Sequence, residues 1–509
     1  MTERFFLTTP IYYASGEPHL GHAYTTLLAD ALARYHRQAG HAVLFLTGTD
    51  EHGQKMQEEA GRRGIAPLQL ADDMAERFRA AWQDMDVSFD RFIRTTEPEH
   101  VAVVQAVYRR LYEKGDIYAA DYQGWYCVHD ERYWTEKDLG PDQTCPDCGR
   151  PVRQIQEKNW FFRMSAYQER LIRHIEENPD WIVPASRRNE VLGFLRSPLE
   201  DLSVSRPKTR LEWGITLPFD EAHVAYVWVD ALFNYVTASG RIRPDAADGE
   251  QGFGETAHDS WWPCQLHIVG KDILTTHAVY WPTLLMAADL PLPLQILAHG
   301  WWVAGGRKMS KSLGNVIDPL QLRSAYGTDA VRWYLLREMP VGQDASFTEE
   351  RFLMRYEELA NVLGNLASRV TSMIERYRGG MVPDAPGRDL DEAVRDARVQ
   401  VQAAYGSLRV HDALGAAMDL ARTANVYVEE RQPWAQAKAE DPAPLDETLA
   451  TLYRSLVWLV ALLEPVLPEK MSRLAGHLGL PAVPTLAEAG NDAPAGRTVR
   501  KGDPLFPKA

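Results

Sequence analysis

The chain has few cysteines, no excess of positive charge and no long apolar run, and each shortage excludes a class of protein. Four cysteines among 509 residues are too few for a disulfide scaffold. Because 55 basic residues stand against 70 acidic ones, the formal charge is −15, and nucleic acid cannot be bound through bulk positive charge. Residues 1–7 lack the pattern of a signal peptide, and no stretch has the length and apolarity of a membrane span. We therefore expect a cytoplasmic protein without a membrane partner, which holds any nucleic acid through local patches.

The composition and the first 46 residues indicate a globular α/β protein. With 45% hydrophobic and 25% charged residues the composition is ordinary for a folded protein, and the length suggests about three domains. An apolar run at 5–9, a helical pattern at 19–38 and a second apolar run at 43–46 predict a βαβ unit, and hence a parallel sheet. A turn-rich insertion follows from about 116 to 219, after which we expect further strands at 224–229, 266–269 and 294–297.

The character of the chain changes beyond about residue 348, where the strand signals end. Helical periodicity with few interior glycines or prolines covers 349–377, 389–407, 411–431 and 444–464. Four helices joined by short loops predict an antiparallel bundle. The tail beyond about residue 476 is rich in proline, glycine and alanine, and we expect it to pack loosely.

Two short motifs combine residue types that bind polyphosphate. His19-Leu20-Gly21-His22 stands at the turn into the first helix, where free N–H groups and the positive end of the helix dipole attract phosphate. Lys308-Met309-Ser310-Lys311 follows the last strand, and two lysines three residues apart can neutralise charge on a phosphorus under attack. Either motif alone is also compatible with a chance string or a solvated basic turn.

The order of these and other motifs resembles that of the class I aminoacyl-tRNA synthetases, and in detail that of the methionyl family. The match extends from Phe5 to about Pro468. Besides the two phosphate motifs it comprises Tyr12-Tyr13, Gly48-Thr49-Asp50-Glu51-His52-Gly53, Tyr226-Val227-Trp228-Val229-Asp230-Ala231, Gly270-Lys271-Asp272-Ile273, His299-Gly300-Trp301 and Asn365-Leu366-Ala367-Ser368-Arg369. So many motifs in one order make coincidence very improbable.

The resemblance implies an α/β fold with an inserted domain and a helical C-terminal domain. The catalytic domain would be a Rossmann-like parallel sheet in two halves. The implied ranges are 1–115 and 223–300 for these halves, 116–222 for a connective insertion with a zinc knuckle at about 124–155, 301–348 for the KMSKS loop and the contacts to the tRNA stem, 349–476 for an all-α anticodon-binding bundle, and 477–509 for a C-terminal tail.

The resemblance also implies the activity of a methionine–tRNA ligase. Such an enzyme activates L-methionine with ATP to methionyl-adenylate, releases pyrophosphate, and transfers methionine to the 3′ end of initiator and elongator tRNA(Met). By similarity, His19, Gly21 and His22 bind ATP, as does Ser310, while Lys308 and Lys311 stabilise the transition state and the departing pyrophosphate. Mg²⁺ would accompany ATP, held mostly by phosphate oxygens and water.

The amino-acid pocket implied by the resemblance is rich in aromatic residues. A methionine side chain is long and apolar, and its polarizable sulfur favours aromatic edges. Asp50 would hold the α-ammonium group. The implied lining consists of Ile11, Tyr13, Trp228, Ala231, Tyr235, Ile273, His277 and Trp281. The alternative is that some of these residues are ordinary core.

Three cysteines fall close together and indicate a metal site. Cys145 and Cys148 form a Cys-x-x-Cys pair next to a glycine, which is typical of a structural zinc site, and Cys127 is the third candidate ligand. Where related synthetases often have a second such pair, this chain has Asp130 at the matching position. Asp130 is the fourth ligand by spacing and His129 is the better ligand by chemistry, so both remain open. The alternative is a decayed site that binds no metal.

The bundle is the anticodon reader by resemblance, with Asn365, Arg369 and Trp434 as the residues that contact the anticodon loop. Three other functions compete with this interpretation: an adenylate-forming nucleotidyltransferase that uses no tRNA, a non-catalytic tRNA-binding scaffold, and a sister synthetase for leucine, isoleucine, valine or cysteine. Since the chain ends at Ala509 without room for the dimerisation domain of some relatives, we expect a monomer.

Overall fold

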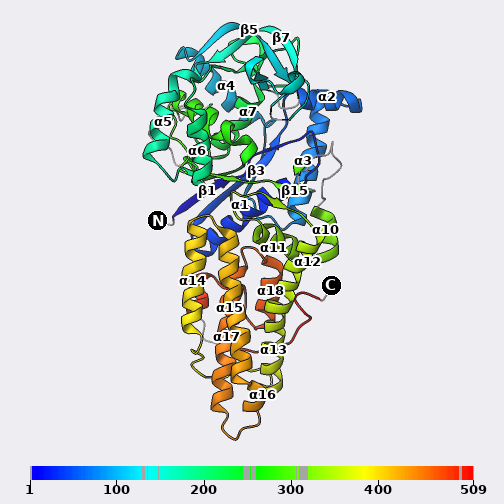
Figure 1. The fold of residues 1–509 in the computed structure, drawn as a ribbon, viewed down its shortest axis with the longest axis vertical. Helices are drawn as coiled ribbons and strands as arrows, with labels where there is room; N and C mark the ends of the chain where they lie inside the picture. Colours follow the sequence, from blue (N-terminus) through cyan, green and yellow to red (C-terminus); the bar gives the residue numbers. More distant parts are fainter. Residues whose placement is uncertain are drawn as a thin grey trace.

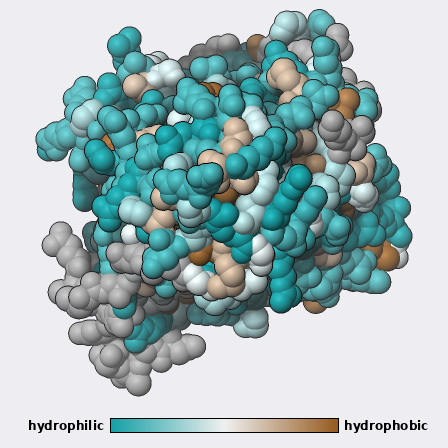
Figure 2. Space-filling view, turned by 90° about the horizontal axis from the view of Figure 1, so that it is seen from below, coloured by the Kyte–Doolittle hydropathy of each residue, from teal (hydrophilic) through white to brown (hydrophobic). Residues whose placement is uncertain are grey.

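The computed structural model describes residues 3–128, 132–134, 136–146, 148–244, 253, 260–304, 307–308, 319–491 and 496–507. An α/β domain stands at one end of the elongated molecule, and a bundle of helices extends from it (Figure 1). The described part of the chain contains no helix that is long and apolar enough to cross a membrane. Seen from the bundle end, the surface is mostly hydrophilic with scattered apolar residues (Figure 2).

A parallel sheet of seven strands organises the α/β domain, as the βαβ pattern predicts. The strands are β1 (Arg4–Thr8), β2 (Tyr12–Tyr13), β3 (Ala42–Asp50), β4 (Arg91–Arg94), β8 (Ile182–Val183), β13 (Leu266–Gly270) and β14 (Ile296–His299). Their order is β2-β3-β1-β13-β14-β8, with β4 paired to β3, and every pairing is parallel. Close approach of β4 explains Gly48, because a Cβ there would lie 2.0 Å from the carbonyl oxygen of Ile93.

The sheet reverses its winding direction between β1 and β13. From β1 the chain crosses through α1 (Leu20–Gln38) to β3 on one side, whereas from β13 it crosses through α9 (Trp281–Ala287) to β14 on the other. Connections that diverge in this way leave a crevice at the carboxyl ends of the two strands, where α/β proteins bind ligands. The first phosphate motif follows β1 and therefore stands at this crevice.

The strand expected at 224–229 is wrong. Val224 and Ala225 end β12 (Asp220–Ala225), which pairs antiparallel with β10 (Ser205–Pro207) and β11 (Thr216–Leu217) in a separate small sheet. Val227 already begins helix α7 (Val227–Leu232). Short apolar runs carry no periodicity that separates a buried strand from a buried helix, which is why the sequence misled here.

The insertion is built on a long antiparallel ribbon. β5 (Ile117–Cys127) and β7 (Arg153–Phe162) form it, flanked by β6 (Arg132–Trp134) and β9 (Leu202–Ser203), at the end of the molecule remote from the bundle (Figure 1). The remaining helices of the α/β region and insertion are α2 (Gln54–Arg63), α3 (Pro67–Asp84), α4 (Pro98–Glu113), α5 (Gln168–Glu177), α6 (Ala185–Phe194), α8 (Asn234–Ala238), α10 (Pro319–Tyr326) and α11 (Thr328–Glu338).

The helical bundle agrees with the four predicted helical segments. The first segment is α12 (Glu349–Glu358) and α13 (Asn365–Arg378), joined through a π-helical turn at Leu359–Gly364. The others are α14 (Asp391–Gly406), α15 (Val410–Arg431) and α17 (Ala443–Leu463), followed by α18 (Pro468–His477) and two short helices, α16 (Pro433–Gln436) and α19 (Leu486–Asn491). All of these helices except α16 contribute buried apolar residues to the common core of the bundle.

The loose packing expected for the C-terminal tail is wrong. Val499, Leu505 and Phe506 are at most 4% exposed and belong to the bundle core. The tail also pairs with the bundle through a bridge between Met381 and Thr498. Three apolar side chains are enough to hold this segment, although its proline and glycine content points to a loop.

A buried ion pair between α1 and α11, together with the bonds of its neighbours to the chain after α17, joins the α/β domain to the bundle. Asp30 of α1 lies 2.6 Å from Arg332 of α11, and neither side chain is exposed. Arg34 of α1 also reaches Glu464, at 3.1 Å, just beyond α17. Because α1 carries the first phosphate motif at its other end, this junction ties the orientation of the bundle to the helix that begins at the crevice.

Candidate active site

The two histidines of the first motif meet at the N-terminus of α1. His19 is the N-cap residue, and its Nδ1 accepts a hydrogen bond from the Gly21 N–H at 3.1 Å. The His19 and His22 rings stack with centroids 3.6 Å apart. A Cβ at Gly21 would lie 3.0 Å from the His19 ring, so a side chain there would crowd this pair. The arrangement presents two half-buried imidazoles and the first-turn N–H groups to one ligand.

The second turn of α1 is bonded to the strand that leads into the lysine motif. Thr25 Oγ1 lies 2.8 Å from His299 Nε2, and His299 Nδ1 donates to the Gly300 carbonyl at 2.7 Å. Burial lowers the pKa of His299, so its ring is neutral and Nε2 accepts from Thr25. Beyond His299 the chain forms β15 (Trp302–Ala304) and β16 (Arg307–Lys308), with Val303 opposite Lys308. Ser310 and Lys311 lie outside the described residues.

Asp50 and Tyr13 come together through the pairing of β2 with β3. Tyr13 is opposite Asp50 in the parallel register, and the Asp50 side chain is almost completely buried. The Tyr13 ring meets the Trp228 ring edge to face, with centroids 6.1 Å apart. A carboxylate beside two half-buried aromatic rings can hold an ammonium group next to an apolar side chain.

A hydrogen-bonded chain fixes the far wall of this pocket. His277 Nδ1 donates to the Ile273 carbonyl at 3.0 Å, so Nε2 is free to accept from the Tyr235 hydroxyl at 2.8 Å. Burial lowers the pKa of His277 to about 4, and the imidazole is therefore neutral at pH 7. Trp281 lies behind Tyr235, completely buried, and its indole N–H donates to His267 Nε2 at 3.2 Å. The wall is rigid and carries no net charge.

The structure sorts the remaining predicted lining residues by exposure. Ile11 and Ile273 are partly buried and pack against the same core as Tyr13 and Trp228, so part of each surface remains available. Ala231 is 5% exposed, which makes it a spacer in the wall. Four predicted residues thus keep contactable surface, while the others support them.

Sequence reasoning did not single out a buried His-Asp-His cluster beneath the pocket. Asp230 accepts from His52 Nδ1 at 2.7 Å and from His100 Nε2 at 2.8 Å, and His100 also lies 3.0 Å from Thr237. Burial alone would raise the pKa of Asp230, but the two imidazoles outweigh it and the pKa lies below its ordinary value. The cluster clamps the loop after Asp50 to α7, which carries Trp228. His52 stands in a quoted motif and could have been found there, whereas His100 has no local signal.

The three cysteines of the insertion converge on one point. Their sulfur atoms all lie within 4.8 Å of one another, and Cys127 Sγ is 3.6 Å from Cys148 Sγ. Tetrahedral zinc with bonds of about 2.3 Å requires sulfur atoms about 3.8 Å apart, so this donor set fits the ion. Gly149, with a φ of +69°, makes the turn after the Cys-x-x-Cys pair. Both candidates for the fourth ligand, Asp130 and His129, lie outside the described residues.

The predicted anticodon residues gather towards the end of the bundle remote from the sheet. Arg369 of α13 forms an ion pair with Glu429 of α15 at 2.6 Å, which brings the two helices together five residues before Trp434. Trp434 is 39% exposed, unusual for so large an apolar ring, and Asn365 is exposed. α13 and α16 both pack against α17 (Figure 1). The exposed ring and polar groups suit the stacking and edge contacts that single-stranded RNA requires.

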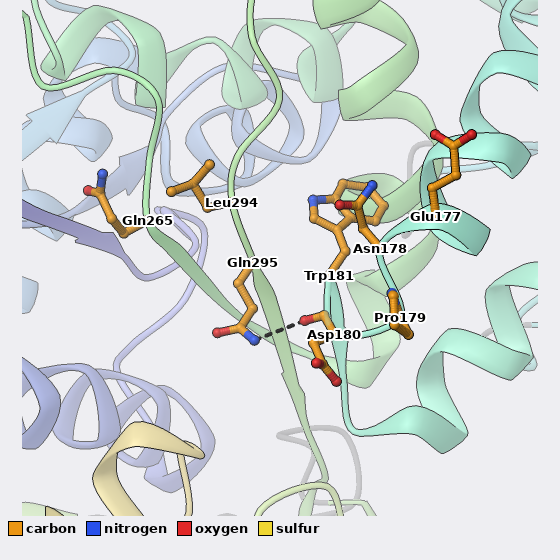
Figure 3. Close-up of a pocket in the computed structure, with 8 residues that line it drawn as sticks. All are labelled: Glu177, Asn178, Pro179, Asp180, Trp181, Gln265, Leu294 and Gln295. Carbon is orange, nitrogen blue, oxygen red and sulfur yellow. Dashed lines mark hydrogen bonds between the residues drawn. The ribbon is translucent and has the colours of Figure 1, made fainter.

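One cavity lies away from all of these residues. It has a volume of about 390 Å³ and stands at the amino ends of β8, β13 and β14, on the edge of the sheet opposite the histidine motif (Figure 3). Its two glutamines bond within the protein: Gln295 Nε2 donates to the Asp180 carbonyl at 2.9 Å, and Gln265 Oε1 accepts from the Phe6 N–H at 2.6 Å.

Comparison with known proteins agrees with the fold and the crevice. A family model described as tRNA synthetases class I (M) matches residues 5–156 and 148–371. The fold, the histidine pair at the switch point and this match together define the class as that of the class I tRNA synthetases.

Comparison with individual proteins identifies the family within this class. The chain is 43% identical over its full length to the methionine–tRNA ligase of Caldanaerobacter subterraneus subsp. tengcongensis, covering 79% of that protein, and 44% identical over 99% of its length to that of Clostridium tetani, covering 78%. It belongs to the methionine–tRNA ligase family. Among solved structures it resembles Mycobacterium tuberculosis methionyl-tRNA synthetase in complex with methionyl-adenylate, with a TM-score of 0.93, 39% identity and coverage of 99% of this chain and 100% of that one. The TM-score to the apo form of that enzyme is 0.87, at 36% identity and with coverage of 100% and 99%.

Proposed function

We propose that this protein activates L-methionine with ATP to give methionyl-adenylate and pyrophosphate, and then transfers methionine to the 3′ end of tRNA(Met). The observation that carries the proposal is the stacked His19–His22 pair at the N-terminus of α1, one strand away from an aromatic pocket with a buried carboxylate. The first feature suits a polyphosphate and the second suits an amino acid with an apolar side chain. Their proximity to one crevice suits a reaction between the two.

The activation step is a displacement in which no bond to the protein forms. The methionine carboxylate oxygen attacks the α-phosphorus, the bond from that phosphorus to the bridging oxygen breaks, and pyrophosphate leaves with the electron pair. His19 and His22 donate to phosphate oxygens from the helix N-terminus, with Gly21 leaving room for the nucleotide. Lys308, Ser310 and Lys311 complete the nucleotide site in this proposal, the lysines offsetting charge on the leaving group. Mg²⁺ arrives with ATP as part of the substrate.

Recognition of methionine rests on shape and on the absence of charge. Tyr13 and Trp228 present aromatic surface to the thioether, with Ile11 and Ile273 beside them, while Asp50 holds the ammonium group. His277 is neutral because of its burial, so the Tyr235–His277 wall does not attract a charged side chain. Ala231 and Trp281 support this wall from the core. A shorter aliphatic side chain would leave part of the pocket unfilled.

The tRNA partner follows from the bundle. Asn365, Arg369 and Trp434 would contact the bases of the anticodon loop. Residues that contact only the anticodon loop cannot distinguish initiator from elongator tRNA(Met) when the two tRNAs share that loop. Both tRNAs are therefore substrates in this proposal. The histidine motif at the N-terminus of α1 belongs to the α/β domain, whereas α13 and α16 lie in the bundle that extends from it, as an extended tRNA requires (Figure 1).

The insertion carries one structural zinc ion in this proposal, held by Cys127, Cys145 and Cys148. The spacing of their sulfur atoms supports it. Asp130 is the proposed fourth ligand, with His129 as the alternative. A site with four protein ligands has no open position, so the ion would stabilise the fold of the ribbon and take no part in the reaction.

ATP–pyrophosphate exchange tests the activation step directly. Purified protein is assayed with methionine and, separately, with leucine, isoleucine, valine and cysteine. Exchange with methionine alone supports the proposal, and exchange driven better by one of the other four amino acids overturns it in favour of a sister synthetase. Aminoacylation of tRNA(Met) in the same preparation is the second measurement: exchange without charging of either tRNA(Met) would indicate an adenylate-forming enzyme that uses no tRNA.

A further inference from the structure

A second cavity lies in the bundle and is unrelated to the residues described so far. Its volume is about 370 Å³, and it lies between the first turns of α14, the middle of α17 and the short helix α19. This volume is within the range of sites for small ligands, about 300–1,000 Å³. It is therefore large enough for more than a single inorganic ion.

Four arginines line this cavity: Arg388, Arg395, Arg398 and Arg454. Asp391 is the single acidic residue among the described residues that line it. None of the four guanidinium groups forms an ion pair with any residue that the structure describes. The chain as a whole is acidic, with a formal charge of −15, so its composition favours negatively charged surfaces. A local concentration of unpaired positive charge is therefore an exception.

The best-placed arginine is the one nearest the bundle core. Arg454 is half-buried, and its Nε is enclosed without a hydrogen-bond partner among the described residues. A buried donor without an acceptor is unfavourable, and an anion in the cavity would supply the acceptor. Arg398 is held in a defined position because its guanidinium lies 4.4 Å over the Trp458 ring.

The backbone adds to the positive field of the cavity. α14 begins at Asp391, and the preceding Leu390 provides no side-chain cap, so the positive end of the dipole of this 16-residue helix lies beside the cavity. Gly387 keeps the preceding loop against α17, because a Cβ there would lie 2.7 Å from the backbone of Ala450. Loop, helix end and arginines thus form one preformed concave surface.

We propose that this cavity, which we name the arginine pocket and define by Arg388, Arg395, Arg398 and Arg454, binds a small phosphate-bearing anion with at least two phosphate groups, as free pyrophosphate or as the diphosphate of a nucleotide. Arginine forks match phosphate oxygens in pairs, and four arginines around a cavity of about 370 Å³ suit an anion larger than a single phosphate. Trp458 is already covered by Arg398 and is 7% exposed, so it offers no surface on which an RNA base could stack.

The position of the arginine pocket separates it from the proposed anticodon contacts. It lies on α14, whereas Asn365 and Arg369 lie on α13, and Figure 1 shows these two helices on opposite sides of the bundle. A tRNA held through α13 and α16 would leave α14 uncovered. The observations therefore favour a small anion over an RNA backbone as the occupant.

Calorimetric titration of the full chain tests the proposal. The active site is first saturated with a non-hydrolysable methionyl-adenylate analogue, and inorganic pyrophosphate and ADP are then titrated separately. We expect one of the two to bind with a stoichiometry of one, and tighter binding of ADP would assign the nucleotide form. Removing charge with R395A and R454A together should weaken binding by about tenfold or more for each arginine, while R376A, which removes an exposed arginine elsewhere in the bundle, should not change it.

Three results would overturn the proposal. One is the absence of binding of either probe to the saturated wild-type protein, and another is equal binding by R395A/R454A and the wild type. The third is a raised KM for tRNA in R395A/R454A with unchanged anion binding, which would assign these arginines to RNA. Thermal melting checks that the double variant is folded. Methionine-dependent exchange should be normal in it, so a failure here is distinct from a failure of the proposed aminoacylation activity.

Discussion

The Asp30–Arg332 pair allows the coupling between the two halves of the molecule to be tested quantitatively. Arg332 donates to Asp30 at 2.6 Å and also to the backbone carbonyls of Val466, Pro465 and Met85, at 2.9, 3.0 and 3.1 Å. Neither side chain of the ion pair is exposed. The pair therefore joins α1 to segments more than a hundred residues away in the chain.

Asp30→Asn removes one charge and leaves the buried guanidinium without its counterion. Breaking a buried pair in this way costs about 3–5 kcal/mol. Arg332→Met should cost nearer the lower figure, because Asp30 keeps two other partners, Arg34 at 2.8 Å and the Ser88 N–H at 2.7 Å. We therefore predict that Asp30→Asn lowers the free energy of unfolding by more than Arg332→Met does.

Urea unfolding followed by tryptophan fluorescence measures the loss of stability. A second readout is functional: we expect methionine-dependent exchange to be retained under native conditions, while the KM for tRNA rises because the bundle is held less firmly. Arg376→Ala is the control for loss of an exposed arginine in the bundle. A loss below about 1 kcal/mol in both variants, the value of an exposed pair, would refute the reasoning, as would a KM for tRNA equal to that of the wild type.

Further predictions follow from the histidine motif, the cysteines and a buried carboxyl. His22→Ala should lower the exchange rate by about a hundredfold or more, the effect of losing one donor to developing charge, whereas His41→Ala just beyond α1 should not. Cys145→Ala should remove zinc from the purified protein in metal analysis, and Cys264→Ala, a buried cysteine outside the cluster, should retain it. Burial raises the pKa of Asp329 to about 7, well above its unfolded value of about 3.9. The native state then binds more protons than the unfolded state, so unfolding free energy should fall as pH rises from about 4 to 7, and Asp329→Asn should flatten this slope.

Each of these has a result that contradicts it. Equal exchange rates for the His22 and His41 variants would show that His22 does not contribute to nucleotide binding. Wild-type protein purified without zinc under non-chelating conditions would support the decayed site. A pH slope that is unchanged in the Asp329 variant would assign the titration to another group.

The sequence alone predicted the features that depend on residues close together in the chain. The 3.6-residue periodicity located α14, α15 and α17 to within a few residues, and the alternation of apolar runs with a helix identified the parallel sheet. The histidine motif, the Cys-x-x-Cys pair and their neighbours were visible because chemistry of this kind needs fixed residue types at fixed spacing. Propensity and periodicity depend on neighbours in the chain, so they can be read without the fold.

The tertiary structure decided what depends on residues distant in sequence. That Val224–Val229 divides between a strand and a helix, and that Leu505 and Phe506 are core rather than loose tail, depended on which surfaces were available to cover those apolar side chains. The His52–Asp230–His100 cluster, the Asp30–Arg332 pair and the arginine pocket each join groups that no local pattern connects. Burial and pairing of charge are properties of the packed chain, because the free energy of a buried charge is set by whatever the fold brings next to it.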